Sequence, residues 1–189
     1  MYLRKYSHDL KLSNLFFCSD THFFHKSICK YSNRPYGNLE EMHNDIVSKF
    51  NSKITPKDTL ILIGDITFGD LPETKKILDA INGHKILVCG NHDDSDTEKL
   101  FSNHSDFLKL RVFDLNNEKH NLVLCHYALR VWDKSHHGSI SLYGHSHGSL
   151  PGEGKQMDVG VDTNNMYPYS FDEIMERMNN IDIKKVDHH

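Results

Sequence analysis

The stretch LFFCSDTH (residues 15–22) begins with four apolar residues and ends with side chains of metal-binding type. A short continuous apolar run is typical of a strand that is buried on both faces. We therefore expect a strand over 15–18 that places Asp20 at its carboxyl end. The stretches TLILIGD (59–65) and KILVCGNHD (85–93) repeat this arrangement. Together the three stretches predict a sheet that carries polar side chains at one edge.

Helices are predicted between these strands. Apolar residues recur at helical spacing from 39 to 50, and Asn38 with Glu41 forms a possible capping box, which predicts a helix over 38–53. A second helix is expected to begin at Asp70 and to end before Gly83, and a short one to follow Asp96. The alternation of strand and helix favours a parallel sheet with helices packed on it.

The second half of the chain predicts more strands. Residues 110–115 and 121–125 flank an Asn pair and are expected to form a hairpin whose second strand ends before His126. Runs at 140–143 and 157–161 flank GHSHG (144–148), and 171–178 has the spacing of an amphipathic helix. We interpret this half as antiparallel. The whole chain then predicts an α/β fold of two packed sheets flanked by helices.

Length and composition narrow the class of protein. The 189 residues suit one domain, 1–189. No apolar run has the length of a membrane span, and the first residues lack the pattern of a secretory signal, so we expect a cytoplasmic protein that binds no membrane. Four scattered cysteines without a CxxC pair are expected to be buried thiols. A net charge of −4 argues against extended nucleic-acid binding and favours a small anionic substrate.

Fifteen histidines are an unusual number, and their positions indicate chemistry. Five short signatures follow one another, each at or just after an apolar run: Asp20-x-His22, Gly64-Asp65, Gly90-Asn91-His92-Asp93, His126 and Gly144-His145-x-His147. Each signature occurs by chance in many proteins, but all five in this order rarely do. Carboxylate, amide and imidazole ligands together suit Mn²⁺, Fe²⁺, Zn²⁺ or Ni²⁺ better than Ca²⁺.

These signatures, in this order, resemble those of the calcineurin-like metallophosphoesterase superfamily. The text SDTHFFHKSICKYSNRPY with YGHSHG is similar to short bacterial and phage phosphoesterases. The resemblance implies a four-layer α/β/β/α sandwich of two mixed β-sheets and two divalent metal ions, with Mn²⁺ favoured. It further implies that a metal-bridging water attacks a phosphate ester. Its metal ligands would be Asp20, His22 and His147 for the first ion, Asn91, His126 and His145 for the second, and Asp65 for both.

The same resemblance implies that His92 acts as a proton donor or electrostatic support at the leaving oxygen, and Asp93 is expected to orient it. His25 and Arg34 are candidate substrate contacts, because a guanidinium can bind phosphate through two hydrogen bonds, although Arg34 could equally cap local backbone. Tyr127 and Trp132 are possible base-stacking surfaces, with ordinary packing favoured for both.

The substrate class remains open among small phosphodiesters, cyclic nucleotides and monoesters. A protein phosphatase is disfavoured, because Thr67, Phe68 and Cys89 stand where that branch carries arginines beside its motifs. A metallo-β-lactamase-like enzyme would need an HxHxDH run, which is absent. The alternative from another class is a metal-stabilised protein-interaction scaffold of the same fold without catalysis.

Overall fold

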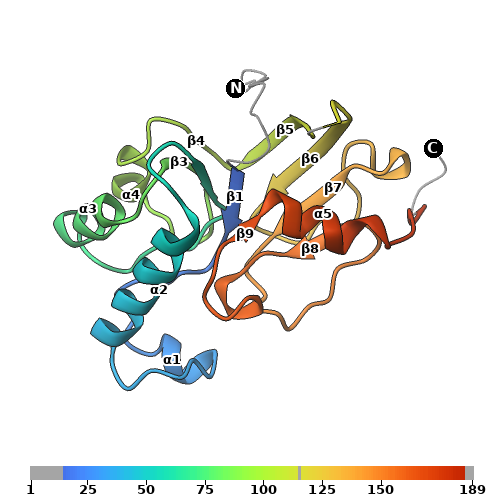
Figure 1. Cartoon of the computed structure of the whole chain (residues 1–189). Coiled ribbons are helices and arrows are strands. Elements are labelled where there is room, and N and C mark those ends of the chain that lie inside the picture. Colours follow the sequence, from blue (N-terminus) through green and yellow to red (C-terminus); the bar gives the residue numbers. More distant parts are fainter. Residues whose placement is uncertain (1–14, 115, 186–189) are drawn as a thin grey trace.

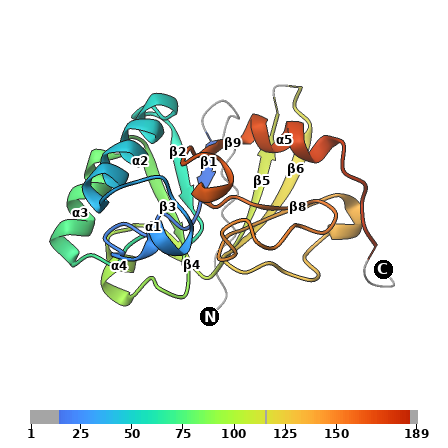
Figure 2. The same cartoon turned by 90° about the horizontal axis from the view of Figure 1, so that it is seen from below.

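The computed structural model describes residues 15–114 and 116–185, and in it two β-sheets pack against each other (Figures 1 and 2). The first sheet has the order β4-β3-β2-β1-β9, in which β9 alone runs antiparallel to its neighbour. Its strands are β1 (Leu15–Cys18), β2 (Thr59–Leu62), β3 (His84–Val88), β4 (His104–Ser105) and β9 (Tyr169–Ser170). The three predicted central strands are therefore confirmed.

The second sheet has the order β5-β6-β7-β8 and consists of β5 (Phe107–Phe113), β6 (Lys119–Cys125), β7 (Ile140–Tyr143) and β8 (Gln156–Asp158). The hairpin of β5 and β6 is antiparallel as predicted, although Leu115 of the predicted strand lies outside the described residues. The pairs β6–β7 and β7–β8 are parallel, so the antiparallel prediction was wrong for them. Long connections over 126–139 and 144–155 carry the chain back, which makes parallel pairing possible.

Helices cover the outer face of the first sheet, and α5 crosses the end of the sheet pair (Figures 1 and 2). The helices are α1 (Ile28–Tyr31), α2 (Leu39–Lys53), α3 (Leu71–Ala80), α4 (Ser95–Lys99) and α5 (Phe171–Asn179), with short 3₁₀ helices η2 (Ser135–His137) and η3 (Val161–Thr163). Asn38 caps α2 by accepting from the Glu41 N–H, while the Glu41 carboxylate accepts from Gly37 instead of completing a capping box.

Two hydrophobic cores share the first sheet. Phe17 and Ile61 face the second sheet, whereas Phe16 and Leu60 face the helices, as alternation along a strand requires. Because both faces are covered, these strands are apolar throughout, which explains the continuous runs in the sequence. The predicted fold class, α/β with two mixed sheets flanked by helices, is confirmed. Among the described residues, no helix is long and apolar enough to cross a membrane.

The two sheets meet at one edge through backbone hydrogen bonds. Ser19 follows β1, and its N–H donates to the Val159 carbonyl at 3.1 Å, while the Val161 N–H donates to the Ser19 carbonyl at 3.1 Å. Val159 and Val161 follow β8. The carboxyl ends of strands from both sheets are thereby brought together, and the loops that follow them can form one site.

Candidate metal centre

Two clusters of possible metal ligands lie at this edge. One consists of Asp20, His22 and His147, and the other of Asp65, His126 and His145; within each, the ligand atoms lie within 4.8 Å of one another. These are the two groups that the sequence predicts. In the first, Asp20 Oδ1 lies 3.7 Å from His22 Nε2 and 3.9 Å from His147 Nε2.

Asp65 lies between the clusters. Its Oδ2 is 3.7 Å from His22 Nε2 of the first cluster, and its Oδ1 is 3.5 Å from His126 Nε2 of the second. Burial disfavours the charged form, but the hydrogen bond and charge of His126, with the His92 N–H, outweigh it and lower the pKa of Asp65 to about 2. A carboxylate that stays ionised and faces both clusters can serve two cations.

Asn91 belongs beside the second cluster, because its Oδ1 lies 3.1 Å from His126 Nε2. The other nitrogen of His126, Nδ1, lies 2.8 Å from the Ile63 carbonyl oxygen. A carbonyl oxygen only accepts, so Nδ1 carries a hydrogen whether or not the ring is charged. Burial lowers the pKa of His126, but the hydrogen bond and charge of Asp65 outweigh it and raise that pKa, which favours a second proton on Nε2. Loss of this proton leaves a lone pair on Nε2, facing the cluster.

His147 is oriented in the same way. Its Nδ1 lies 2.7 Å from Asp162 Oδ2 and 3.2 Å from Ser32 Oγ, so that Nε2 faces Asp20. A carboxylate that accepts from the outer nitrogen of an imidazole is the usual support for a metal-binding histidine.

His22 provides a test of whether these residues fit a cation. Both of its ring nitrogens are buried and have no hydrogen-bond partner among the described residues. Leaving a buried polar group unsatisfied costs roughly 1–3 kcal/mol, so such groups are rare unless something else binds them. A cation at Nε2, between Asp20 and Asp65, would satisfy that nitrogen of the ring. Carboxylate, amide oxygen and imidazole donors also suit divalent first-row metals, and the residues present therefore fit two such ions.

Most of the ligand residues have left-handed backbone conformations. The φ angles are 57° at Asp20, 49° at His22, 56° at Asp65, 67° at His145 and 48° at His147. This conformation costs a residue other than glycine roughly 1–2 kcal/mol, and it persists only where the surroundings enforce it. Here hydrogen bonds between loops do so: the Asp20 N–H donates to the Gly64 carbonyl at 3.0 Å and the His22 N–H to the Asp65 carbonyl at 3.1 Å.

The glycines of the motifs are needed because these loops touch. A Cβ on Gly64 would lie 2.5 Å from His126 Nδ1 and 2.6 Å from Gly90 Cα. A Cβ on Gly90 would overlap the carboxylate of Asp65, and one on Gly144 would overlap Asp20. Side chains at these positions would push the ligands apart.

The prediction that Asp93 orients His92 was wrong. The Asp93 carboxylate accepts three backbone N–H groups instead, from Asp65 at 2.9 Å, Gly90 at 2.8 Å and Ile66 at 3.0 Å. Burial of this carboxylate raises its pKa, with the backbone hydrogen bonds acting in the opposite direction. Asp93 therefore fixes the loop after β2 to the loop after β3.

Arg34 has a structural role instead of the predicted substrate contact. Its side chain is fully buried, and Nε and Nη2 donate to the two oxygens of Asp162 at 2.7 and 2.8 Å. Its Nη2 and Nη1 also donate to the carbonyls of Asp20 at 2.6 Å and Thr21 at 2.8 Å. Arg34 thus fixes the first ligand loop and holds Asp162 against His147.

Sequence reasoning missed Asp162. The available signal was its position after the apolar run at 157–161, which is where the other site residues stand relative to their strands. A lone Asp in VDT matches no motif, and its partners Arg34 and His147 lie 128 and 15 residues away in the chain.

His92 and His25 lie at the rim of the site. His92 is 46% exposed, with Nε2 4.0 Å from Asp65 Oδ2. The His25 ring lies 5.5 Å from the His22 ring and stacks on Phe68 at 4.3 Å. Trp132 donates through Nε1 to the Ser139 carbonyl at 3.0 Å, so its polar end is engaged in its own loop.

Two other features lie apart from this centre. Asp114, Glu118 and His120 form a third group of possible metal ligands. The Asp114 carboxylate accepts hydrogen bonds from the N–H groups of Asn116 and Glu118, so its position is explained by the turn that it stabilises.

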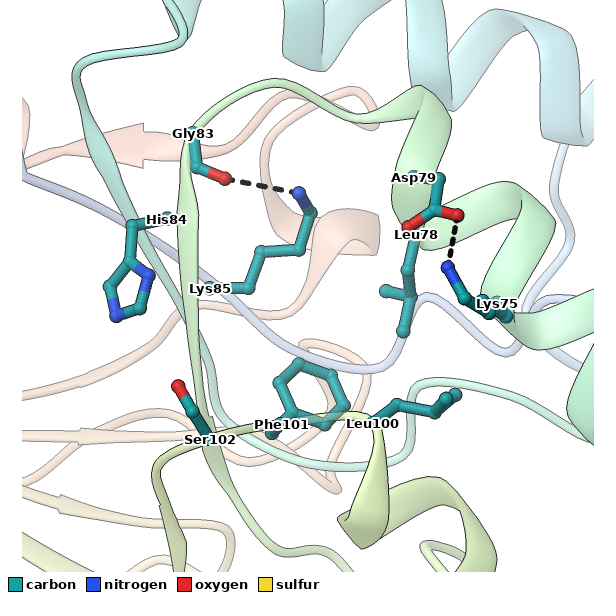
Figure 3. Close-up of a pocket in the computed structure, with 9 residues that line it drawn as sticks. All are labelled: Lys75, Leu78, Asp79, Gly83, His84, Lys85, Leu100, Phe101 and Ser102. Carbon is teal, nitrogen blue, oxygen red and sulfur yellow. Dashed lines mark hydrogen bonds and ion pairs between the residues drawn. The ribbon is translucent and has the colours of Figure 1, made fainter.

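A hollow of about 290 Å³ lies beside Lys85 at the amino end of β3, opposite the ligand edge (Figure 3). There Lys85 Nζ donates to carbonyls of the adjoining loop, including that of Gly83.

Comparison with known proteins agrees with the motifs. A family model described as a calcineurin-like phosphoesterase superfamily domain matches residues 14–159. The chain is 27% identical to the uncharacterized protein MJ1445 of Methanocaldococcus jannaschii over 176 residues, covering 88% of this chain and 92% of that one. It is 26% identical to the Gene 66 protein of Mycobacterium phage L5 over 201 residues, covering 90% and 96% respectively. The crystal structure of AQ665, a protein of unknown function from Aquifex aeolicus, has a TM-score of 0.67 at 25% identity and covers 87% of this chain and 98% of that one.

Proposed function

Because the chain belongs to the calcineurin-like phosphoesterase superfamily, we propose that it hydrolyses small phosphate esters with two divalent cations bound at the edge where its sheets meet. The observation that carries this proposal is the position of Asp65, whose two oxygens face His22 on one side and His126 on the other. We also propose that residues 1–189 form one domain, since both cores share the first sheet.

Each cation has its own ligands in this proposal. Asp20, His22 and His147 hold the first ion, Asn91, His126 and His145 hold the second, and Asp65 binds both. When bound, two divalent cations supply Lewis-acid charge that lowers the pKa of water and neutralises the phosphoryl oxygens. We favour Mn²⁺ among the metals that these donors suit, which include Fe²⁺, Zn²⁺ and Ni²⁺.

The remaining residues have separate tasks. Asp162 and the Ile63 carbonyl fix the rings of His147 and His126, so the ligands are oriented before any cation arrives. His92 stands at the exposed rim, where its imidazole can donate a proton to the departing oxygen of an ester. His25, whose ring lies 5.5 Å from that of His22, is proposed to contact the substrate.

A phosphodiester is the favoured substrate over a monoester. Arg34 is committed to Asp162 and to backbone carbonyls, so its guanidinium is not available to the phosphate. The dianion of a monoester benefits more than the monoanion of a diester from such an extra cationic group. Cyclic nucleotides are diesters and remain within this class.

The rival function is a scaffold that binds metal without catalysis. The two readings are separated by incubating the protein with bis-p-nitrophenyl phosphate and each of Mn²⁺, Fe²⁺, Zn²⁺ and Ni²⁺, with EDTA as the blank. We expect hydrolysis with at least one metal and none with EDTA. Failure with every metal, with this diester and with p-nitrophenyl phosphate, would favour the scaffold.

The shared role of Asp65 has its own test. We expect Asp65→Asn to lower the content of both ions, because the lost charge serves both, and metal analysis of the purified protein measures this directly. Asp79→Asn is the matched control, since Asp79 pairs with Lys75 on the exposed side of α3. Full occupancy in Asp65→Asn would contradict bridging even if activity fell.

A further inference from the structure

Three aromatic side chains are strongly exposed among the residues that the structure describes, and all three lie beside histidines of the site. Phe68 is 42% exposed, Tyr127 is 48% exposed and Tyr31 is 73% exposed. The Tyr31 ring lies 5.9 Å from that of His25. A single exposed apolar side chain needs no explanation, but a gathering of exposed rings around one polar centre does.

Phe68 lies on the side of the first cluster. It follows β2, and its ring stacks on those of His25 at 4.3 Å and His22 at 5.4 Å, with the ring of His92 at 4.8 Å. The ring therefore borders both a predicted metal ligand and the predicted proton donor. Part of its surface remains in water.

Tyr127 lies on the side of the second cluster. It directly follows His126, and its ring lies 5.3 Å from that of His126 and 4.9 Å from that of His145. Both contacts are edge-to-face, at 71° and 65°. One exposed ring thus adjoins each of the two clusters, and the two come from different sheets.

From this arrangement we propose that Phe68 and Tyr127 are specificity-determining residues that bind a flat aromatic group of the substrate, so that the ester cleaved here is a nucleoside phosphodiester. The inference rests on the proposed function, because it places the phosphate between the two rings. An aromatic ring stacks on any nucleobase, since every base has a π face, and this makes the contact tolerant of sequence. The negative charge of the chain is no obstacle, because a single nucleotide unit needs no basic surface.

The test compares two diesters that share a leaving group. Thymidine 5′-(p-nitrophenyl phosphate) and methyl p-nitrophenyl phosphate release the same chromophore and differ in the nucleoside. We expect the wild type to have the higher kcat/KM for the thymidine ester. Stacking on one ring corresponds to roughly a 5-fold effect or more, so Phe68→Ala and Tyr127→Ala should each lower the ratio of the two kcat/KM values at least that far. The loss should appear mainly in KM.

Controls separate stacking from a merely structural role. Phe68→Tyr keeps a flat ring and should keep the ratio, whereas Ile183→Ala removes an equally exposed apolar side chain near Gly138 and should leave it unchanged. If the rings only cover the metal ligands, both substrates lose activity together and the ratio stays constant, which overturns the inference. A wild type without preference for the thymidine ester overturns it as well.

Failure of the proposed function has a different signature. It appears as no hydrolysis of either diester, whatever the variant. Calorimetry then tests the inference without catalysis, by measuring the binding of thymidine 5′-monophosphate and of inorganic phosphate to Mn²⁺-loaded protein. Weaker binding of the nucleotide, but not of phosphate, in Phe68→Ala supports it, and equal binding in wild type and variant refutes it.

Discussion

Replacing Arg34 by methionine should destabilise the fold strongly, because it leaves the buried carboxylate of Asp162 without its arginine partner and with only the His147 ring beside it. The side chain of Arg34 is fully buried and that of Asp162 is 7% exposed. Removing one member of a buried ion pair costs about 3–5 kcal/mol. The carbonyls of Asp20 and Thr21 lose their donors in addition. For a chain of this size, each kcal/mol lowers Tm by about 2–4 °C, so we expect a loss of about 6–20 °C.

The assay is thermal unfolding followed by circular dichroism in EDTA, so that bound metal does not alter Tm. Arg111→Met is the matched control: it removes the same groups from an exposed position on β5 and should change stability by no more than about 0.5 kcal/mol. Arg34→Lys keeps the charge but cannot bind both oxygens of Asp162, so its Tm should lie between those of Arg34→Met and Arg111→Met.

The same variants report on the metal centre. Asp162 orients His147 through Nδ1, and loss of such a supporting contact typically weakens metal binding by about 10–100-fold. Arg34→Lys, the milder variant, should therefore bind the metal more weakly than wild type at a temperature where both are folded. If Arg34→Met and Arg111→Met have the same Tm, the buried pair of Arg34 and Asp162 does not stabilise this loop, and the reasoning is refuted.

Three further outcomes are expected. His92→Ala should slow turnover by roughly 10²–10⁴-fold yet keep its metals and its Tm, since the ring is 46% exposed; undiminished turnover would remove its catalytic role. Gly64→Ala should lower the free energy of unfolding in urea by about 2–4 kcal/mol, because residue 64 has a φ of 84° and the added Cβ would lie 2.5 Å from His126 Nδ1. Gly37→Ala is its control and should cost far less, because a Cβ at residue 37 would meet nothing closer than 3.5 Å. Burial raises the pKa of the Cys89 thiol to about 12, so iodoacetamide at pH 8 should leave Cys89 unmodified in native protein and alkylate it in urea. Peptide mass mapping measures the labelling, and equal labelling in both conditions would contradict the burial of this thiol.

The sequence predicted most of the first sheet, because a buried strand has a local pattern. The residues that meet in the two clusters of possible metal ligands were predicted from the order of the motifs and the family that they resemble. A run such as Leu15–Cys18 specifies a strand buried on both faces, and polar residues just beyond it must lie at the sheet edge. The direction of β7 and β8 was not predictable in this way, since it depends on how loops cross the sheet.

The supporting contacts were also beyond local reasoning. Arg34 and Asp162 are distant in the chain, and nothing near either residue indicates that they pair. Asp93 lies beside His92 in the sequence, yet its carboxylate faces the backbone of Asp65 and Gly90. Adjacency in sequence predicted the wrong partner because successive residues of a loop point in different directions.

Each cluster of possible metal ligands contains residues that follow strands of both sheets. Asp20, His22 and Asp65 follow strands of the first sheet, whereas His126, His145 and His147 follow strands of the second. Neither half of the polypeptide supplies all the residues of either cluster, so the proposed metal binding would come after, or together with, docking of the halves. The free energy of that binding would then be part of the free energy that holds the sheets together. If the proposed ions bind here, depriving the protein of metal would weaken its architecture as well as its chemistry.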